Sequence, residues 1–352
     1  MPSKIVQRIE RALGMADLVD ALARKLPASD LRSLLMEVYQ ERSAMATEPA
    51  LLAQAVRDPL VTPSSVSARD FAAFDQAAFE AARGFDALDL SPVCPFGVSS
   101  KLGGTHQNNL LTTIRNVEGL GDSTIAMALE AARRRASGEV IRLCASHRVI
   151  RLQPFEGPGL TPHFRLFATV TAGRDTGSST FETRHLVEHV RVYLNLFRLL
   201  ESAGFSIQSP LVELTDMAAI EAALQAAGVN QAVVRQNIRA HWYGGSERFL
   251  KEHGLDLSSD APHPLLRQAV IAPLQSEFPE AQFRVNQSRL EGFGYYRAFA
   301  LRISPQAPDG NRYPVADGGF TDWTARLLGN RKERLLISGI GSEFLCKKYW
   351  RS

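Results

Sequence analysis

The fold is decided by two short segments, VIRLQ at residues 149–153 and HFRLF at residues 163–167. They lie in β-rich runs, residues 140–152 and 164–171, and Gly157-Pro158-Gly159 between them favours a turn. We therefore expect two neighbouring antiparallel strands. A guanidinium carried by a rigid strand can hold a phosphate or a carboxylate in a fixed orientation. Arg151 is thus the first candidate site residue.

The segments around this hairpin indicate a mixed fold. Helices are expected at 71–82, 124–135 and 183–202, and strands at 88–93, 295–303 and 334–340. This order predicts an α+β fold in which an antiparallel β-sheet is flanked by helices.

The hairpin resembles motif 2 of the class II aminoacyl-tRNA synthetases, in which an arginine ends one strand and R/H-x-x-x-F follows on the next. The resemblance implies that Arg151 is catalytic and contacts the α-phosphate of ATP and the carboxylate of the amino acid. It also implies that His163 reaches the terminal phosphate and that Phe167 stacks on adenine. Gln153 stands where the family has an acidic residue, and its amide can still hydrogen-bond adenine.

Two blocks before the hairpin continue the resemblance. Residues 83–92, which begin with Arg-Gly-Phe and end with proline, are similar to motif 1, the dimer-interface element of the family, with the proline one residue late. Asp122 and Thr124 open a helix where the histidyl enzymes have Pro-Glu-x-Thr, which implies that they bind the α-ammonium of an amino acid. Asp122 could equally serve only as the cap of that helix.

The block EGFGYY at residues 291–296 resembles the histidyl signature Arg-Gly-Leu-Asp-Tyr-Tyr, which lines the amino-acid pocket. Tyr295 and Tyr296 keep both aromatic rings, whereas Glu291 and Gly294 replace the arginine and the aspartate. The exchange of a catalytic arginine for an acid argues against histidine as the substrate and against the ordinary chemistry.

Two glycine-containing blocks complete the resemblance near the C-terminal end. Gly318 and Gly319 stand where the family has Gly-Gly-Arg-Tyr-Asp, which implies a place in the amino-acid site. The block GIGSEF at residues 339–344 resembles motif 3, Gly-x-Gly-x-Glu-Arg, which assigns Gly341 and Glu343 to ATP binding. Glu343 is the one protein group considered as a ligand of Mg²⁺.

A competing pattern lies in the helix expected at 183–202. His185, Glu188 and His189 spell HxxEH, the inverted zinc-protease pattern, which puts two imidazoles on one helical face. Five-residue patterns arise often by chance, and the neighbouring blocks explain the region without a metal. A zinc hydrolase is therefore the third and weakest alternative.

Composition restricts the class of protein. The 352 residues are 45% hydrophobic with a net charge of +3, which lacks the clustered basic footprint of a dedicated nucleic-acid binder. Cys94, Cys144 and Cys346 are far apart and odd in number, which argues against a disulfide framework. No apolar run approaches the ~18 residues of a membrane span, so we expect a cytoplasmic protein.

We expect four segments: an N-terminal helical extension and linker at 1–67, a core with motifs 1 and 2 at 68–205, a helical insert at 206–288, and a core part with the Tyr-Tyr block and motif 3 at 289–352. The resemblance covers residues 83–346 and implies a homodimer through motif 1. An anticodon-binding domain is not expected in this chain, and tRNA is therefore not an expected partner.

The leading hypothesis is adenylation of a small amino acid or related carboxylate with ATP and Mg²⁺, followed by transfer to an acceptor other than tRNA. The alternative is a catalytically silent paralogue, similar to the regulatory subunit of ATP phosphoribosyltransferase, that binds an effector and a partner protein. The replacement of three arginines by Glu291, Phe320 and Phe344 favours the alternative, since each charge-assisted contact is worth about 1.5–3 kcal/mol.

Overall fold

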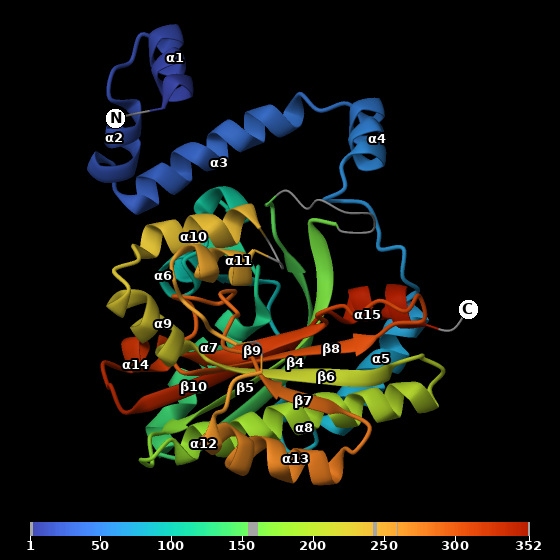
Figure 1. Ribbon diagram of the computed structural model, residues 1–352. Coiled ribbons are helices and arrows are strands. Elements are labelled where there is room, and N and C mark those ends of the chain that lie inside the picture. Colours follow the sequence, from blue (N-terminus) through green and yellow to red (C-terminus); the bar gives the residue numbers. More distant parts are fainter. Residues whose placement is uncertain (1–2, 154–160, 242–244, 259, 351–352) are drawn as a thin grey trace.

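The computed structural model describes residues 3–153, 161–241, 245–258 and 260–350, and the expected turn at 157–159 lies outside them. An eight-stranded sheet with the order β1-β4-β5-β10-β9-β8-β6-β7 forms the centre of the molecule (Figure 1). The pairs β1/β4 and β6/β7 are parallel and the other neighbours are antiparallel. The expected α+β class with a mainly antiparallel sheet is confirmed.

The strands of this sheet are β1 (Asp86–Ala87), β4 (Ile141–Ile150), β5 (His163–Arg174), β6 (Gln208–Asp216), β7 (Gln282–Val285), β8 (Phe299–Gln306), β9 (Ala316–Thr321) and β10 (Glu333–Ile340). A separate two-stranded sheet consists of β2 (Val93–Pro95) and β3 (Val117–Gly119). The expected hairpin is the pair β4/β5, in which Ile150 lies opposite His163 and Arg148 opposite Arg165.

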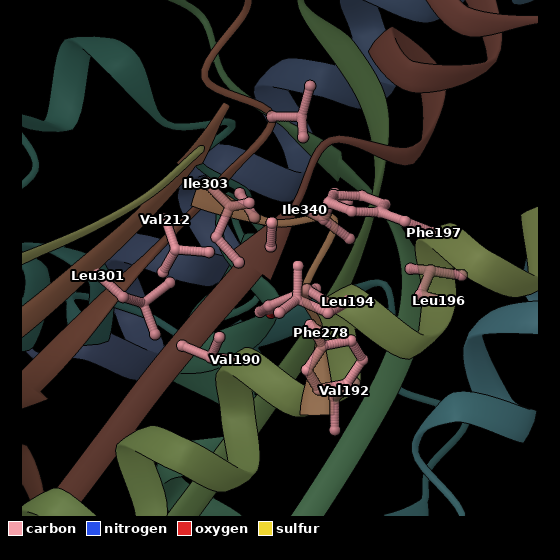
Figure 2. Packing of buried hydrophobic residues seen from close by; sticks show 14 of the residues in the cluster. Val190, Val192, Leu194, Leu196, Phe197, Val212, Phe278, Leu301, Ile303 and Ile340 are labelled. Atoms are coloured by element: carbon pink, nitrogen blue, oxygen red, sulfur yellow. The ribbon is translucent and has the colours of Figure 1, made fainter. Parts of the chain in front are cut away.

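One face of the sheet is covered by α5 (Ala68–Ala81), α8 (Thr180–Ser202), α12 (Pro264–Leu266), the π-helix η4 (Arg267–Ile271), α13 (Ala272–Glu277) and α15 (Ser342–Tyr349). Figure 2 shows Val190, Leu194 and Phe197 of α8 close to Leu301 and Ile303 of β8, all within one core. Each of these side chains is at most 2% exposed. Their full burial is worth about 1.5–3 kcal/mol per side chain, so this face supplies much of the stability.

The opposite face carries a second core and the helices around it. These are α6 (Val98–Gly103), the 3₁₀-helices η2 (Gln107–Asn109) and η3 (Arg135–Ser137), α7 (Ser123–Arg134), α9 (Met217–Ala226), α10 (Gln231–Ala240), α11 (Ser246–Glu252) and α14 (Trp323–Leu328). Met127 of α7 and Trp323 of α14 pack there against Leu143, Ala168 and Val170 of the sheet. This face holds the cavity described below.

The segment expected as a helical insert at 206–288 differs from that prediction at both ends. Its helices α9 to α13 are present, but it begins with β6 and ends with β7, which both belong to the central sheet. Most of β6 from Pro210 to Thr215 is buried, so β6 lacks the alternation that marks a half-exposed strand. Likewise, residues 88–92 are not a strand, and β8 starts at Phe299 instead of Tyr295.

The predicted helical extension is present as α1 (Lys4–Leu13), α2 (Leu18–Asp20), the π-helix η1 (Ala21–Lys25), α3 (Ala28–Ala44) and α4 (Glu48–Arg57). None of these helices has a buried residue. Large apolar side chains are exposed along it, including Ile5, Leu13, Met45, Leu52 and Val56. None of the described helices combines the length and apolar character that a membrane span requires.

Polar contacts join the end of this extension to the core. Ser64 donates to Glu343 Oε1 at 2.7 Å, and His163 Nε2 lies 2.7 Å from the carbonyl oxygen of Thr62. Because Arg148 donates to His163 Nδ1 at 2.9 Å, Nε2 carries the ring proton and is the donor to Thr62. The extension is thus attached at residues 62–64.

Candidate functional site

A cavity of about 510 Å³ lies between the end of β4, the start of α7, α10 and the loop before β8. Six of the residues predicted from separate sequence blocks line it: Asp122, Thr124, Arg151, Gln153, Tyr295 and Tyr296. The fold therefore brings the motif 2 arginine, the acidic helix start and the Tyr-Tyr block to one place.

Asp122 acts as a helix cap and faces the cavity at the same time. Its Oδ1 accepts hydrogen bonds from the backbone N–H of Thr124 at 2.9 Å and from the Thr124 hydroxyl at 2.7 Å. Its Oδ2 lies 3.6 Å from a terminal nitrogen of Arg151. Asp122 can therefore cap the helix through Oδ1 and face a ligand through Oδ2, so the two interpretations of this residue are compatible.

Arg151 is held at the wall of the cavity by contacts on two sides. Its Nε donates to the carbonyl oxygen of Gly121 at 2.7 Å, and its guanidinium carbon lies 5.3 Å from the centre of the Phe164 ring. The side chain is still 31% exposed. A guanidinium fixed in this way can bind an incoming carboxylate with little loss of conformational entropy.

The two tyrosines form an aromatic wall beside the Arg151 pair. The Tyr296 hydroxyl donates to Asp317 Oδ1 at 2.6 Å, and its ring makes a T-shaped contact with Tyr295 at 5.0 Å. Burial, and then the charge of Asp317, raises the pKa of Tyr296 well above its ordinary value. Burial, followed by the charge of Asp122, does the same for the pKa of Tyr295, so both phenols are neutral.

Gly318 and Gly319 support this wall from behind and are not among the residues that line the cavity. A Cβ added at Gly319 would lie 2.6 Å from the Tyr296 ring, and one added at Gly318 would lie 2.4 Å from Ser338 Cβ. Their lack of side chains therefore lets Tyr296 and β10 approach β9 closely. The two glycines thus shape the wall of the cavity from behind, and a contact with the amino acid stays a prediction.

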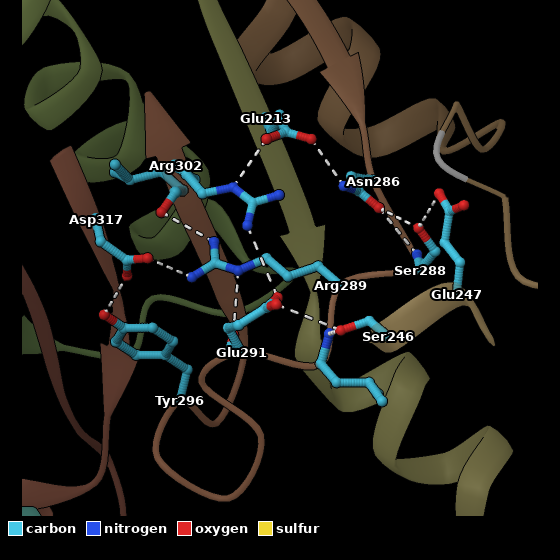
Figure 3. Close-up of polar contacts among 12 residues, drawn as sticks. Glu213, Ser246, Glu247, Asn286, Ser288, Arg289, Glu291, Tyr296, Arg302 and Asp317 are labelled. Atoms are coloured by element: carbon cyan, nitrogen blue, oxygen red, sulfur yellow. Dashed lines mark hydrogen bonds and ion pairs between the residues drawn. The ribbon is translucent and has the colours of Figure 1, made fainter. Parts of the chain in front are cut away.

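Arg289 is a cavity residue that the sequence reasoning missed (Figure 3). It is 2% exposed, and it donates to Asp317 Oδ2 at 2.6 Å and to the carbonyl oxygens of Leu301 and Glu291 at 3.1 and 3.0 Å. Only Glu291 was compared with the family arginine, while Arg289 stands two residues earlier. The cavity thus keeps a buried guanidinium beside the Tyr-Tyr block.

A chain of charges continues from Arg289 toward β6. Glu291 lies 3.7 Å from Arg302, and Arg302 donates to the fully buried Glu213 at 2.8 Å (Figure 3). Burial opposes ionisation of Glu213, but hydrogen bonds from Arg302, Arg284 and Asn286 outweigh it and lower its pKa to about 2. The negative charge of Glu291 is therefore balanced by Arg302, within a network of ion pairs that reaches Glu213.

Phe167 lies on the other face of the sheet from this cavity. It is 0% exposed and makes a T-shaped contact with Phe79 of α5 at 5.7 Å, whereas its neighbours Leu166 and Ala168 line the cavity. Successive side chains of a strand point to opposite faces, so a shift of one residue exchanges the two environments. The prediction that Phe167 stacks on adenine in this site is corrected.

Glu343 and His163 also lie away from the cavity. Glu343 is 1% exposed and accepts hydrogen bonds from Ser64, Arg148 and the backbone of Arg165 and pairs with Lys347 at 3.0 Å. Its oxygens are therefore occupied, which argues against Mg²⁺ binding there. His163 is bonded to Arg148 and Thr62 as described above.

Of the other motif 3 positions, Gly339 lines the cavity, whereas Gly341 and Phe344 do not. Gly341 donates its N–H to the carbonyl oxygen of Val315, and the Phe344 ring packs on Tyr313 at 5.5 Å. Phe320 is 2% exposed in the core beneath α8. The phenylalanines at 320 and 344 are thus packing residues, and their presence removes no cation from the cavity.

The HxxEH residues are used in structural contacts. His189 is fully buried, with Nδ1 2.7 Å from the Ser338 hydroxyl and Nε2 2.9 Å from the Thr171 hydroxyl, while His185 Nδ1 lies 2.7 Å from Glu188. Burial lowers the pKa of His189 to about 3. The part of the chain that the structure describes contains no cluster of three or more metal-ligating side chains, and both nitrogens of His189 are occupied. These contacts argue against the zinc hydrolase hypothesis.

The architecture is similar to that of solved structures with low sequence identity. A protein described as an ATP phosphoribosyltransferase regulatory subunit/histidyl-tRNA synthetase from Bacillus halodurans superposes with a TM-score of 0.61 and 14% identity, over 83% of this chain and 82% of that one. A histidine–tRNA ligase subunit from Alicyclobacillus acidocaldarius superposes with a TM-score of 0.61 and 14% identity, over 82% of this chain and 96% of that one. The histidyl-tRNA synthetase from Nostoc sp. PCC 7120 superposes with a TM-score of 0.54 and 12% identity, over 79% of this chain and 70% of that one.

No protein family model and no curated protein sequence matches this chain. At these identities the structural similarity concerns the fold, and the arrangement of strands and helices is what the sequence blocks predicted. The chain therefore has the fold of a class II synthetase core of the histidyl-tRNA synthetase-like type.

Proposed function

We propose that this chain binds a small amino acid or a related zwitterion in the cavity and acts as an effector-binding subunit that does not form an adenylate. The support comes from the wall made by Asp122 and Arg151, which offers a carboxylate for an ammonium group beside a guanidinium for a carboxylate. Tyr295 adds a neutral aromatic surface next to this pair. The wall thus has the complementary charges that a zwitterion requires.

The observation that carries this proposal is the position of the groups expected to bind ATP. Phe167, His163 and Glu343 do not line the cavity, and each is buried in other contacts. A ligand bound beside Arg151 cannot reach them through the sheet. Asp122, Thr124, Tyr295 and Tyr296 thus face one cavity, whereas of the residues expected to bind ATP only Arg151 and Gln153 line it. This contrast supports the proposal.

Calorimetric titration of the full chain with each common amino acid tests this proposal. We expect one or a few of them to bind, and we expect Arg151→Ala to weaken that binding at least tenfold. Amino-acid-dependent exchange of labelled pyrophosphate into ATP should be absent. Exchange that is present in the natural chain and lost in Arg151→Ala would overturn the proposal.

Adenylation with ATP and Mg²⁺, followed by transfer to an acceptor other than tRNA, is the second candidate function. It is favoured by the presence of two arginines, Arg151 and Arg289, in the same cavity, because guanidinium groups stabilise charge that develops on phosphate. With Glu343 committed to its ion pairs, Mg²⁺ would be bound through the phosphates of ATP. The pyrophosphate exchange assay decides between the two functions.

A partner protein is also part of the proposal. The Bacillus halodurans structure is described as a regulatory subunit of ATP phosphoribosyltransferase, and an effector-binding subunit needs an enzyme to act on. We expect this chain, as a homodimer, to bind the phosphoribosyltransferase of its own organism and to alter its activity when the amino acid is present. Sedimentation of the mixed proteins and an activity assay would check both statements, and an activity unchanged by this chain would contradict them.

A further inference from the structure

One wall of the cavity is formed by α10, which carries two arginines. Arg235 and Arg239 line the cavity together with Ile238. Residues four apart lie on one face of a helix, with Cβ atoms about 6 Å apart. The fully buried Val234 and the partly buried Ile238 pack in the second core and fix the orientation of the helix. Both guanidiniums are thus presented at the rim by an anchored element.

The two arginines differ from the other charged groups of the cavity because they are not matched by carboxylates. Each acid of the inner wall is paired with an arginine: Asp122 with Arg151, Asp317 with Arg289 and Glu291 with Arg302. Within the part of the chain that the structure describes, Arg235 donates to the neutral side chain of Gln231 at 3.1 Å. Neither Arg235 nor Arg239 forms an ion pair with an acid of residues 3–153, 161–241, 245–258 or 260–350.

This arrangement is unfavourable without a ligand. Like charges four residues apart on one helix face repel each other and destabilise the helix. The helix dipole compensates a cation in the last turn, which applies to Arg239 but not to Arg235 in the middle of α10. Gly294, which has no side chain, faces Arg235, since the Arg235 guanidinium lies 3.4 Å from the position that a Cβ of Gly294 would occupy. The acid of the same loop, Glu291, is paired with Arg302.

We propose that Arg235 and Arg239 form an oxyanion subsite at the rim of the cavity that binds the phosphoryl group of a phosphorylated small molecule. The inference rests on the proposed function in that both assign ligands to the same cavity. A phosphoryl group carries a charge of about −1.5 to −2 at pH 7, which matches two guanidiniums. Its tetrahedral oxygens accept hydrogen bonds from two directions, whereas a carboxylate is satisfied by a single guanidinium fork.

The subsite is tested by calorimetric titration with inorganic pyrophosphate, ribose 5-phosphate and ATP without Mg²⁺. We expect the full chain to bind at least one of these, more weakly at higher salt because the rim is exposed. The double variant Arg235→Gln/Arg239→Gln should weaken that binding at least tenfold. Lysine at both positions should recover part of it, because the charge remains while the fork is lost.

Arg248→Gln is the matched control, because Arg248 lies on the neighbouring α11, pairs with Glu252 and does not line the cavity. It should bind the phosphorylated probes within twofold of the natural chain. Ribose 5-phosphate and ATP distinguish the sources: similar affinities indicate recognition of the phosphoryl group alone, and a preference for ATP indicates a nucleotide. Either result supports the subsite.

Three results would overturn the subsite: no binding of any phosphorylated probe at millimolar concentration, unchanged binding by the double variant, or equally tight binding of the dicarboxylate glutarate. Amino-acid binding is measured in the same variant and should stay within twofold. If no amino acid binds the natural chain while pyrophosphate binds and depends on Arg235 and Arg239, the proposed function fails and the subsite stands.

Discussion

Arg289, which is almost fully buried, donates to Asp317 Oδ2 at 2.6 Å and thereby links the loop before β8 to β9 at the cavity. Asp317 also accepts a hydrogen bond from the Tyr296 hydroxyl, so the same pair fixes the aromatic wall. Removal of one partner of a buried ion pair leaves the other uncompensated and typically costs about 3–5 kcal/mol.

We expect Arg289→Met to lower the free energy of unfolding by about 3 kcal/mol, as measured by urea denaturation. Asp317→Asn should cost at least as much, because it leaves the almost fully buried guanidinium of Arg289 without a negative partner, although the amide keeps one acceptor. Arg248→Met removes an exposed, solvent-screened pair of α11 and should leave the stability close to that of the natural chain. Equal losses in Arg289→Met and Arg248→Met would contradict the importance of the buried pair.

The two roles of Asp122 can be separated by substitution. Asparagine caps helices as well as aspartate does, so Asp122→Asn should keep the stability within a few tenths of a kcal/mol but weaken amino-acid binding at least tenfold. Asp122→Ala should lose binding and in addition about 1 kcal/mol of stability. Asp216 caps α9 outside the cavity by accepting from Ala219 N–H at 3.0 Å, so Asp216→Ala should lower stability only. Calorimetry and thermal unfolding of the four proteins provide the comparison.

Two neighbouring residues of β5 test the assignment of the two faces of the sheet. Phe167→Ala opens the core beneath α5 and should destabilise the protein by about 3–5 kcal/mol, with ligand binding by the folded fraction unchanged. Leu166→Ala should cost less stability, because Leu166 is only partly buried, and should change the affinity for the amino acid. An affinity that responds to Phe167→Ala and not to Leu166→Ala would show that the assignment is wrong.

Glu213 should make the protein sensitive to acid. Its pKa of about 2 in the folded state lies below the ordinary value of 4.5, so the folded state favours the charged form. The corresponding stability is fully present above pH 4.5 and is lost as the pH falls toward 2. Glu213→Gln should therefore be about 2 kcal/mol less stable at pH 7 and show a smaller loss between pH 5 and 2.

Glu37→Gln on α3 is the control, because Glu37 is exposed and its substitution removes one carboxylate without touching the core. Its curve of unfolding free energy against pH should follow that of the natural chain. Parallel curves for all three proteins would contradict the assignment of acid sensitivity to Glu213.

The sequence allowed the hairpin β4/β5, most helices and the meeting of Arg151, Asp122 and Tyr295 to be predicted. The helices and the hairpin could be predicted because helical spacing and turn residues are local signals. The meeting of the three side chains was predicted from the order of the motif-like blocks. Strand β6 was missed because it is buried on both faces. Strand β9 contains Gly318 and Gly319, which have low strand propensity and are needed here for close approach.

The errors in the site have two origins. A strand residue is assigned to one face or the other by its parity, and a comparison of short motifs does not determine parity when spacings differ by a residue. Phe167 was assigned to the wrong face for this reason. Arg289 was missed because only position 291 was compared, although an arginine two residues away can reach the same cavity along the loop.

The helical extension affects how the sequence of this chain can evolve. Since α1 to α4 contain no buried residue, we expect the cooperative unfolding of the core not to depend on them. Cleavage before residue 58 should leave the melting transition of the remaining protein in place. Substitutions in the first four helices then affect only the contacts that those helices make. The sequence of these helices can therefore change faster in evolution than the sequence of the sheet and its two cores.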